Sequence, residues 1–370
     1  MTDPIPVTLL TGFLGAGKTT LLNCLLSDPQ AARVAVVVNE FGDAGLDHDL
    51  IEASAEDVVV MPGGCVCCSI RGDLSKTLIS LLSRRMRNEL AFDRVVIETT
   101  GLADPGPIHH TLLVDPLLAP NYALDGTVTV VDAVLGAATL DRHAEAQAQV
   151  AMADRIVVSK SDLAKAAEIE TLSRKLDRLN PTAPRIVADK GAVPTGSVFG
   201  LGALRKPMSK DHALAWLAQP SNPADPLAGL SGIARPAAKP LSLSHHALDE
   251  RIQTASVTLN RPIPADVFDF WLDTLIALRG PNILRLKGIV HIEDVPHPFV
   301  FHGVQHIFEP PVPLDGWPED DQTSRVVIIA RDIPGSELEE SLSLLQMRRT
   351  PSADDQHFAA GVTVHSLDRR

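Results

Sequence analysis

Short apolar runs alternate with longer amphipathic stretches through the first half of the chain. Each run is rich in valine, isoleucine or leucine, which is typical of a strand buried on both faces of a parallel sheet. The intervening stretches, such as Thr20–Leu26 and Asp73–Arg87, read as helices. Repeated strand–helix units predict an α/β domain with a doubly wound, mainly parallel sheet. The predicted strands are Pro6–Leu10, Arg33–Val38, Asp57–Met61, Arg94–Glu98, Gly126–Asp132, Arg155–Asp162 and Arg185–Ala188.

The pattern changes after residue 205. Residues 206–240 are dense in proline, alanine, serine and glycine, which favours a linker over a packed element. Patterning returns near Arg251 and predicts a smaller α+β domain. We therefore divide the chain into a first domain (1–205), a linker (206–245) and a C-terminal domain (246–370). The C-terminal strands are predicted at Gln253–Leu259, Ile283–Ile292, Phe299–Phe308 and Arg325–Ala330, and the helices at Ala265–Arg279 and Glu337–Met347.

A glycine-rich loop joins the first predicted strand to the first predicted helix. Its sequence GFLGAGKTT fits the phosphate-binding pattern G-x-x-x-x-G-K-[ST] through Gly12, Gly17, Lys18 and Thr19. The glycines let backbone N–H groups turn inward around phosphates, and the helix N-terminus adds its dipole. Lys18 is expected to reach the β- and γ-phosphates, and the Thr19 hydroxyl to ligate Mg²⁺. The loop predicts a P-loop nucleotide site.

Acidic residues follow two predicted strands at the same edge of the sheet, where ligands bind in open α/β folds. The strand ending in Glu98 has Gly101 three positions on, which resembles a Walker B motif. Glu98 is expected to face Mg²⁺ or its waters, and the Gly101 amide to sense the γ-phosphate. Glu40 and Asp43 follow the second strand, where a nucleotide-facing loop and a plain polar cap fit equally well.

Hydrolysis of the nucleotide would need Mg²⁺ on Thr19 and a cation, Lys18, to stabilise charge. With Glu98, these are the expected catalytic residues. The residue that orients the attacking water stays open among Glu40, Asp43 and Glu98.

The segment Ser159-Lys160-Ser161-Asp162 lies where a base-recognition element is expected. Asp162 could accept both N1–H and N2–H of guanine, a pattern that adenine does not offer, and the stem of Lys160 could cover the base. This element therefore favours GTP over ATP.

Three of the 4 cysteines, Cys65, Cys67 and Cys68, follow two glycines in the segment GGCVCC. Thiols this close can converge on one borderline cation, and Zn²⁺ takes three thiolates with a fourth ligand. Gly63 and Gly64 are expected to help a flexible loop wrap the ion. The alternatives are a redox pair or buried small side chains. Cys24 lies among leucines and is assigned to the core.

The overall composition is that of an ordinary globular protein of 370 residues, for which two domains are expected. With 46 acidic and 33 basic residues, the net charge is -13, which argues against a nucleic-acid partner. No apolar run approaches a membrane span, and the first strand leaves no room for a signal peptide. We therefore expect a cytoplasmic protein without a membrane partner.

Six segments occur in an order that resembles CobW-type GTPases: GFLGAGKTT, NEFGD, GGCVCC, VVIETTGLADP, VVDA and SKSD. That family belongs to a metallochaperone class that includes the nickel-insertion GTPases of urease and hydrogenase maturation. The resemblance is close over residues 1 to about 200 and looser over the C-terminal domain. It implies that Ser159, Lys160 and Asp162 recognise guanine, and that Cys65, Cys67 and Cys68 bind the metal with Glu40 as a further ligand. It also implies that phosphates and Mg²⁺ are bound by Gly15, Ala16, Gly17, Lys18, Thr19 and Thr20.

One departure concerns the guanine element, which begins with Asn in the family and with Ser159 here. Serine has a shorter reach and one hydroxyl, so GTP is expected to bind less firmly than it would with Asn. Asp162, which carries the specificity, is retained.

Histidines gather in the C-terminal half at His291, His297, His302 and His306, with His245 and His246 just before them. Along a single strand, His302 and His306 would share a face. We favour ordinary strand positions over a metal site, because no tight HxH or helical HxxxH element is present.

The leading hypothesis is a GTP-driven metallochaperone that passes Zn²⁺ to a client metalloprotein. One alternative changes the cargo or the client: Co²⁺ for cobalamin synthesis, or activation of a metal-dependent hydratase. Another is a regulatory GTPase with a structural metal. Three thiolates favour zinc over cobalt. The client and the oligomeric state, including a homodimer, are left open by the sequence.

Overall fold

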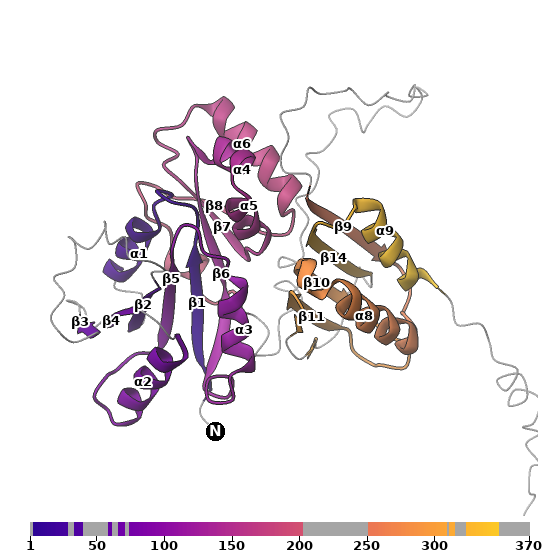
Figure 1. Ribbon diagram of the computed structural model, residues 1–370, viewed down its shortest axis with the longest axis horizontal. Coiled ribbons are helices and arrows are strands. Elements are labelled where there is room, and N and C mark those ends of the chain that lie inside the picture. The colour runs from indigo at the N-terminus through magenta and orange to yellow at the C-terminus, as the bar shows by residue number, and fades with distance from the viewer. Residues whose placement is uncertain are drawn as a thin grey trace, which may run out of the picture.

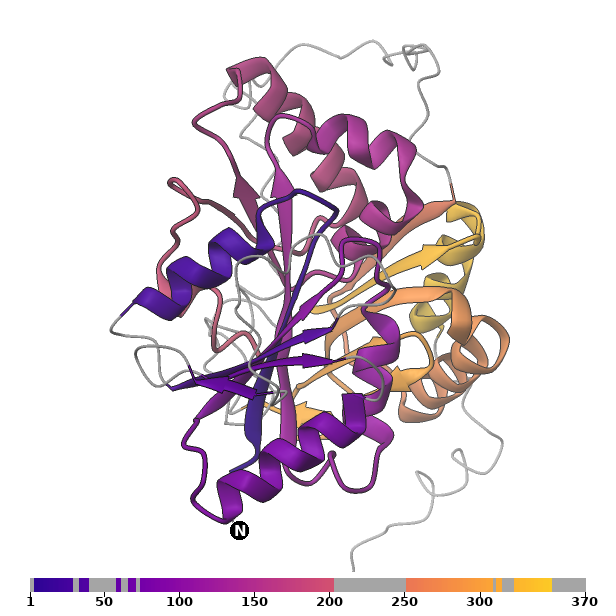
Figure 2. The same cartoon turned by 60° about the vertical axis from the view of Figure 1, so that its left-hand side comes forward.

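The computed structural model describes residues 3–28, 33–39, 58–60, 66–70, 74–202, 251–308, 311–314 and 323–347. These residues form two sheets with helices packed on them, and the two units lie side by side (Figures 1 and 2). The predicted linker at 206–245 lies outside the described residues. The predicted domain boundaries therefore stay predictions.

The first sheet places the strand that leads into the P-loop in its interior. The strand order is β3-β4-β2-β5-β1-β6-β7-β8. Every neighbouring pair is parallel except β3 with β4. The doubly wound, mainly parallel fold is therefore confirmed. The strands are β1 (Ile5–Thr11), β2 (Val34–Asn39), β3 (Val58–Val60), β4 (Val66–Ile70), β5 (Arg94–Thr99), β6 (Tyr122–Asp132), β7 (Arg155–Ser159) and β8 (Arg185–Val187).

Helices cover both faces of this sheet, because its central strands are apolar on both sides. Helix α1 packs Leu21, Leu22 and Leu25 on one face. Helices α2 and α3 cover the other face, and α4, α5 and α6 continue that layer over β6 and β7. The helices are α1 (Lys18–Ser27), α2 (Leu74–Met86), α3 (Gly106–Val114), α4 (Gly136–Arg142), α5 (Ala144–Ala151) and α6 (Ala166–Leu179).

The segment around the cysteines differs from the predicted flexible loop. Val66–Ile70 forms β4, which pairs in parallel with β2 and antiparallel with β3. Cys67 and Cys68 are therefore strand positions, while Cys65 lies outside the described residues. The β-branched residues of β2, β3 and β4 favour pairing, which outweighs the loop tendency of the preceding glycines.

The second unit is a small antiparallel sheet with helices α8 and α9 on one face. Its strand order is β12-β11-β10-β14-β9, with β13 pairing with β11. Phe268 and Trp271 of α8 and Leu338 of α9 fill the core between helices and sheet. The elements are β9 (Ile252–Leu259), α8 (Ala265–Arg279), β10 (Ile283–Val290), β11 (Phe299–Val304), β12 (Ile307–Phe308), β13 (Val312–Pro313), β14 (Ser324–Arg331) and α9 (Gly335–Ser343).

The predicted strand Phe299–Phe308 is instead a hairpin. The chain turns at Gln305, whose φ of 57° lies in the left-handed region, and β12 then folds back on β11. His302 is consequently a buried β11 residue, whereas His306 lies exposed in the turn. The expectation that these two histidines share a strand face was therefore wrong.

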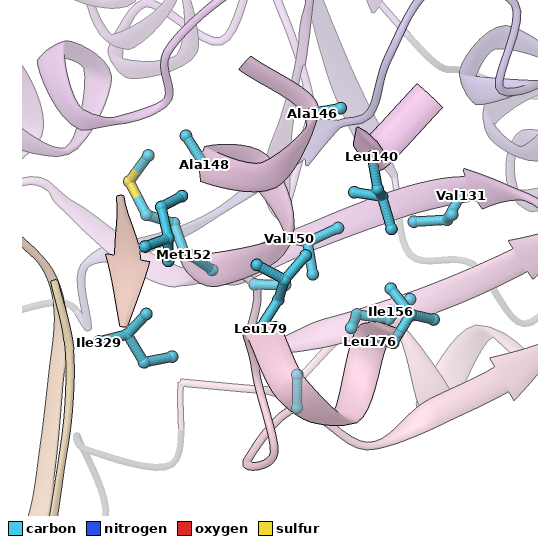
Figure 3. Close-up of a cluster of buried hydrophobic side chains, with 14 of the residues drawn as sticks. Val131, Leu140, Ala146, Ala148, Val150, Met152, Ile156, Leu176, Leu179 and Ile329 are labelled. Carbon is cyan, nitrogen blue, oxygen red and sulfur yellow. The ribbon is translucent and has the colours of Figure 1, made fainter. Parts of the chain in front are cut away.

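The open face of the second sheet packs against the first unit beside α5 and α6. Ile252, Leu284 and Ile329 join one apolar cluster with Met152 and Leu179. Figure 3 shows Ile329 facing Met152 and Leu179 across this boundary.

A buried ion cluster lies at the same boundary. Asp154, directly before β7, forms an ion pair with Arg285 and lies 3.0 Å from the Lys287 Nζ of β10. The Thr127 N–H also donates to Asp154 at 3.0 Å. The side chains of Arg285 and Lys287 are 2% and 1% exposed, so this cluster is shielded from water.

This cluster predicts a pH-dependent stability. Burial lowers the pKa of Lys287 to about 8, although Asp154 opposes the shift. An unfolded Lys287 keeps its proton up to about pH 10.4, so the unfolded state binds more protons between these values. This group should therefore add stability as pH rises from about 8 to 10. Urea unfolding of the wild type and Lys287→Met should show this rise only in the wild type.

At acidic pH, the dependence of stability on pH is set by Asp154. Burial alone would raise its pKa, but Arg285 and Lys287 hold the pKa well below its usual range. Its contribution to stability should be complete above about pH 4 and lost as pH falls below that value.

Candidate functional site

Three glycines of the P-loop have backbone conformations that other residues rarely adopt. Gly12, Gly15 and Gly17 have φ values of 143°, 71° and 95°. A side chain at Gly12 is also excluded because its Cβ would lie 2.3 Å from the carbonyl oxygen of Val130. The loop therefore needs glycine at these positions, as expected for a loop that turns its N–H groups toward a phosphate.

The polar side chains at the start of α1 face the end of β5. Lys18 Nζ donates to the carbonyls of Gly12 at 2.9 Å and Phe13 at 3.3 Å. Thr19 Oγ1 donates to Glu98 Oε1 at 2.8 Å, and Glu98 is buried. The structure thus brings together the hydroxyl and the carboxylate that the sequence assigned to Mg²⁺. A hydroxyl and a carboxylate are the hard oxygen donors that Mg²⁺ prefers, so the two residues fit that ion.

The loop after β5 packs directly on the P-loop. Ala103 N–H donates to the Thr100 carbonyl at 3.1 Å and closes a turn around Gly101. A Cβ at Gly101 would lie 2.5 Å from the backbone nitrogen of Leu14. Because the two backbones are in contact, a movement of this turn toward the P-loop would displace the P-loop.

The predicted base-recognition element, residues 159–162, also forms hydrogen bonds with the P-loop. Ser159 Oγ donates to the Ala16 carbonyl at 2.6 Å. Lys160 Nζ donates to the Gly15 carbonyl at 2.7 Å and to Asp132 Oδ2 at 2.8 Å. Asp162 is exposed at the end of β7, where a base could reach it. Ser159 thus reaches the P-loop despite its short side chain.

Asp132 is a site residue that the sequence reasoning missed. Its Oδ1 accepts the N–H groups of Val134 and Leu135 at 2.7 and 3.0 Å, while its Oδ2 accepts from Lys160. Burial raises the pKa of Asp132, but the bonds from Lys160 and the two N–H groups outweigh it, and the pKa is lowered. Asp132 therefore holds Lys160 in place as an anion. Its position at the carboxyl end of β6 was the available signal.

A cavity of about 260 Å³ lies beside the P-loop, and Asp162 is not among the residues that line it. Its mostly apolar lining comes from residues 13–16, the end of β6, and helices α4 and α5. The polar lining residues are Thr129, Asp132, Thr139, Gln149 and Lys160. Phe13, one of the lining residues, stacks on His143 with ring centroids 4.4 Å apart.

The metal residues are described only in part. Glu40 and Cys65 lie outside the described residues, and β4 places the backbones of Cys67 and Cys68 beside Val36 and Val37 of β2. Val37 in turn pairs with Ile97, the neighbour of Glu98. Among the residues that the structure describes, no group of three or more histidine, cysteine or acidic side chains forms a metal site.

Within those same residues, no helix is long and apolar enough to cross a membrane.

Two family models match the chain. The model described as CobW/HypB/UreG, nucleotide-binding domain, covers residues 6–187. The model described as cobalamin synthesis protein cobW C-terminal domain covers residues 252–345.

The curated relatives are similar over most of their length. The chain is 32% identical over 346 residues to a protein of Escherichia coli named zinc chaperone YjiA, covering 93% of this chain and 99% of the relative. It is 32% identical over 354 residues to the zinc-regulated GTPase metalloprotein activator 1 of Schizosaccharomyces pombe, covering 90% and 83%.

Solved structures agree with this similarity. The crystal structure of the Zn(II)-bound YjiA GTPase from E. coli has a TM-score of 0.72 at 30% identity, covering 93% of this chain and 99% of that one. A triple mutant of the same GTPase, in which one glutamate and two cysteines are replaced by alanine, is also Zn(II)-bound and has a TM-score of 0.71.

Proposed function

This chain belongs to the CobW family of nucleotide-binding proteins, as its motifs predicted, and from that premise we propose that it is a GTP-hydrolysing zinc metallochaperone. The names of the relatives as zinc chaperones and zinc-regulated GTPases support this function. They also favour zinc over cobalt as cargo. The cytoplasm, where we place the protein, is reducing and keeps cysteine thiols available for a metal.

The nucleotide half of this function uses the residues gathered around the P-loop. We assign Mg²⁺ to Thr19 and Glu98, which already lie in contact. When bound, Mg²⁺ would neutralise charge on the β- and γ-phosphates. Lys18 would stabilise the same charge, while Asp162 would select guanine. The hydrogen bonds from Lys160 Nζ to the Gly15 carbonyl and to Asp132 would keep the Lys160 side chain in position.

The proposed coupling between the nucleotide site and the zinc site rests on one observation. A single strand, β2, separates the strand with Cys67 and Cys68 from the strand with Glu98. β4 pairs with β2, and β2 pairs with β5. With strands about 4.8 Å apart, the Cys68 and Ile97 backbones lie roughly 10 Å apart. The same β2 leads into Glu40. A nucleotide that moves the ends of β2 and β5 can therefore change the geometry of the thiol site.

Zinc affinity is expected to depend on the nucleotide. The measurement is competition with a chromogenic chelator, once with a non-hydrolysable GTP analogue and once with GDP. A difference of about tenfold or more corresponds to about 1.4 kcal/mol of coupling between the sites. Steady hydrolysis of GTP with Mg²⁺ is the second expected result.

The matched control uses the cysteine outside the motif. Replacing Cys65, Cys67 and Cys68 by serine should abolish the nucleotide-dependent difference, whereas Cys24→Ser should keep it. Stoichiometry alone is a poor readout, since the related triple mutant is still Zn(II)-bound. Tight zinc binding that is equal with both nucleotides would instead indicate a structural metal in a regulatory GTPase. Tighter nucleotide-linked binding of Co²⁺ than of Zn²⁺ would change the cargo.

The partner required by this function is a client metalloprotein that accepts zinc. We propose no nucleic-acid or membrane partner, in keeping with the net charge of -13. A homodimer stays open, and sedimentation with GDP and with the GTP analogue would decide it.

A further inference from the structure

Helix α5 carries a buried glutamine, Gln149, whose side chain donates two hydrogen bonds to the loop after β5. Gln149 is 0% exposed, and its Nε2 donates to the carbonyls of Gly101 at 3.1 Å and Ala103 at 3.0 Å. These two carbonyls belong to the turn that the Ala103 N–H closes. One side chain therefore holds two of the carbonyls in the turn that contains Gly101.

The turn that contains Gly101 has little space in which to move. Gly101 is buried, and the P-loop backbone at Leu14 leaves no space for even a methyl group. The backbone carbonyl of Gln149 also accepts from Thr129 Oγ1 at 2.8 Å, which ties α5 to β6. The turn as a whole can therefore shift only if the bonds from Gln149 break or the end of α5 follows.

The other end of this connection is the second unit. Three residues after α5, Asp154 forms the buried ion pair with Arg285 and Lys287 of β10. Met152, between them, packs in the apolar cluster with Ile329. A single segment, 149–154, thus connects the Gly101 turn to the C-terminal sheet.

We propose that Gln149 is a positioning residue that sets the Gly101 amide for the γ-phosphate, and that the ion pair of Asp154 with Arg285 makes its position depend on the C-terminal domain. The proposal rests on the proposed GTP hydrolysis. Gln149 does not touch the nucleotide in this role, because its donors are used on the two carbonyls.

The chain contains a closely matched control for this residue. Gln147 lies on the same helix, is 1% exposed, and donates through Nε2 to the Leu140 carbonyl at 2.7 Å, away from the turn. For both glutamines, the described residues offer no partner to Oε1. Replacement of either by leucine removes a buried amide from the same helix, with two hydrogen bonds lost at Gln149 and one at Gln147. A merely structural role therefore predicts kinetic effects that follow the loss of stability in each variant.

The experiment compares Gln149→Leu, Gln147→Leu and the wild type. The measurements are kcat, KM, melting temperature, and the ratio of GDP dissociation constant to that of a non-hydrolysable GTP analogue. Both variants should melt at a lower temperature than the wild type. Gln149→Leu should lower kcat about tenfold or more with KM nearly unchanged, and lower the affinity ratio by several-fold. Gln147→Leu should stay within about twofold of wild type in both. Equal kinetic effects of the two variants would overturn the proposal.

A double-mutant cycle tests the dependence on the C-terminal domain. Arg285→Met should lower kcat, and its effect should largely vanish in the Gln149→Leu background, because both changes act on one connection. Arg279→Met, which breaks an exposed pair with Glu337 in the same domain, should be additive with Gln149→Leu. Additive behaviour of Arg285→Met would overturn this part. A wild-type chain that binds GTP without hydrolysing it would refute the proposed function, while the affinity ratio would still test Gln149.

Discussion

Replacing Asp154 by asparagine is expected to lower the free energy of unfolding by about 3–5 kcal/mol. Asp154 is the carboxylate that balances Arg285 and Lys287, and both cations are buried at the boundary between the two sheets. Removing it leaves two desolvated positive charges facing each other, and an amide cannot neutralise them. The measurement is urea unfolding at pH 7, followed by far-UV circular dichroism.

An exposed ion pair provides the control. Asp93 receives two hydrogen bonds from Arg33, yet the two side chains are 46% and 56% exposed. Asp93→Asn should therefore lower stability far less than Asp154→Asn, because water and salt already screen that pair. If the two asparagine variants unfold at the same urea concentration, the buried cluster does not hold the units together.

Gly101→Ala is expected to reduce kcat at least about 100-fold, the order of loss that a misplacement of about 1 Å produces. The added methyl carbon would lie 2.5 Å from the backbone nitrogen of Leu14, and backbone atoms cannot move aside as the end of a flexible side chain can. The turn and the P-loop must therefore separate. GDP should bind within a few-fold of wild type, because the turn is expected to contact the γ-phosphate. Hydrolysis under saturating GTP measures the effect.

Gly196→Ala is the matched substitution without a clash. No atom lies within 4 Å of the position its Cβ would take. Its activity and stability should equal those of the wild type. Full activity of Gly101→Ala would show that the turn does not approach the nucleotide in the reacting state.

The P-loop and the parallel sheet could be predicted because their sequence signals are local. Glycine is needed where φ is positive, as at Gly15 and Gly17, and a buried strand needs a continuous apolar run. The contact between Thr19 and Glu98 also followed from their positions, since carboxyl ends of neighbouring parallel strands meet at one edge.

The features that were missed depend on long-range pairing. β4 was predicted as a loop because glycines precede the cysteines, and only pairing with β2 and β3 makes the segment a strand. The turn at Gln305 could not be predicted from a glycine or proline, because the residue in the left-handed conformation is a glutamine. Gln149 looks like any helical glutamine until the carbonyls of Gly101 and Ala103 are placed beside it. The roles assigned to Glu40 and Cys65 stay predictions, because both residues lie outside the described ranges.

The position of β1 inside the sheet has a consequence for biosynthesis. Of the described strands, β1 is synthesised before the others, but its neighbours are β5 and β6, which begin at Arg94 and Tyr122. Among the residues that the structure describes, the side chains that bond the carbonyls of Gly15 and Ala16 are those of Lys160 and Ser159, which are synthesised later still. Since contacts between distant residues form slowly, the growing chain carries its P-loop sequence long before it has a finished nucleotide site. A nascent chain that ends before residue 160 should therefore present the cysteine segment without the nucleotide control proposed for it.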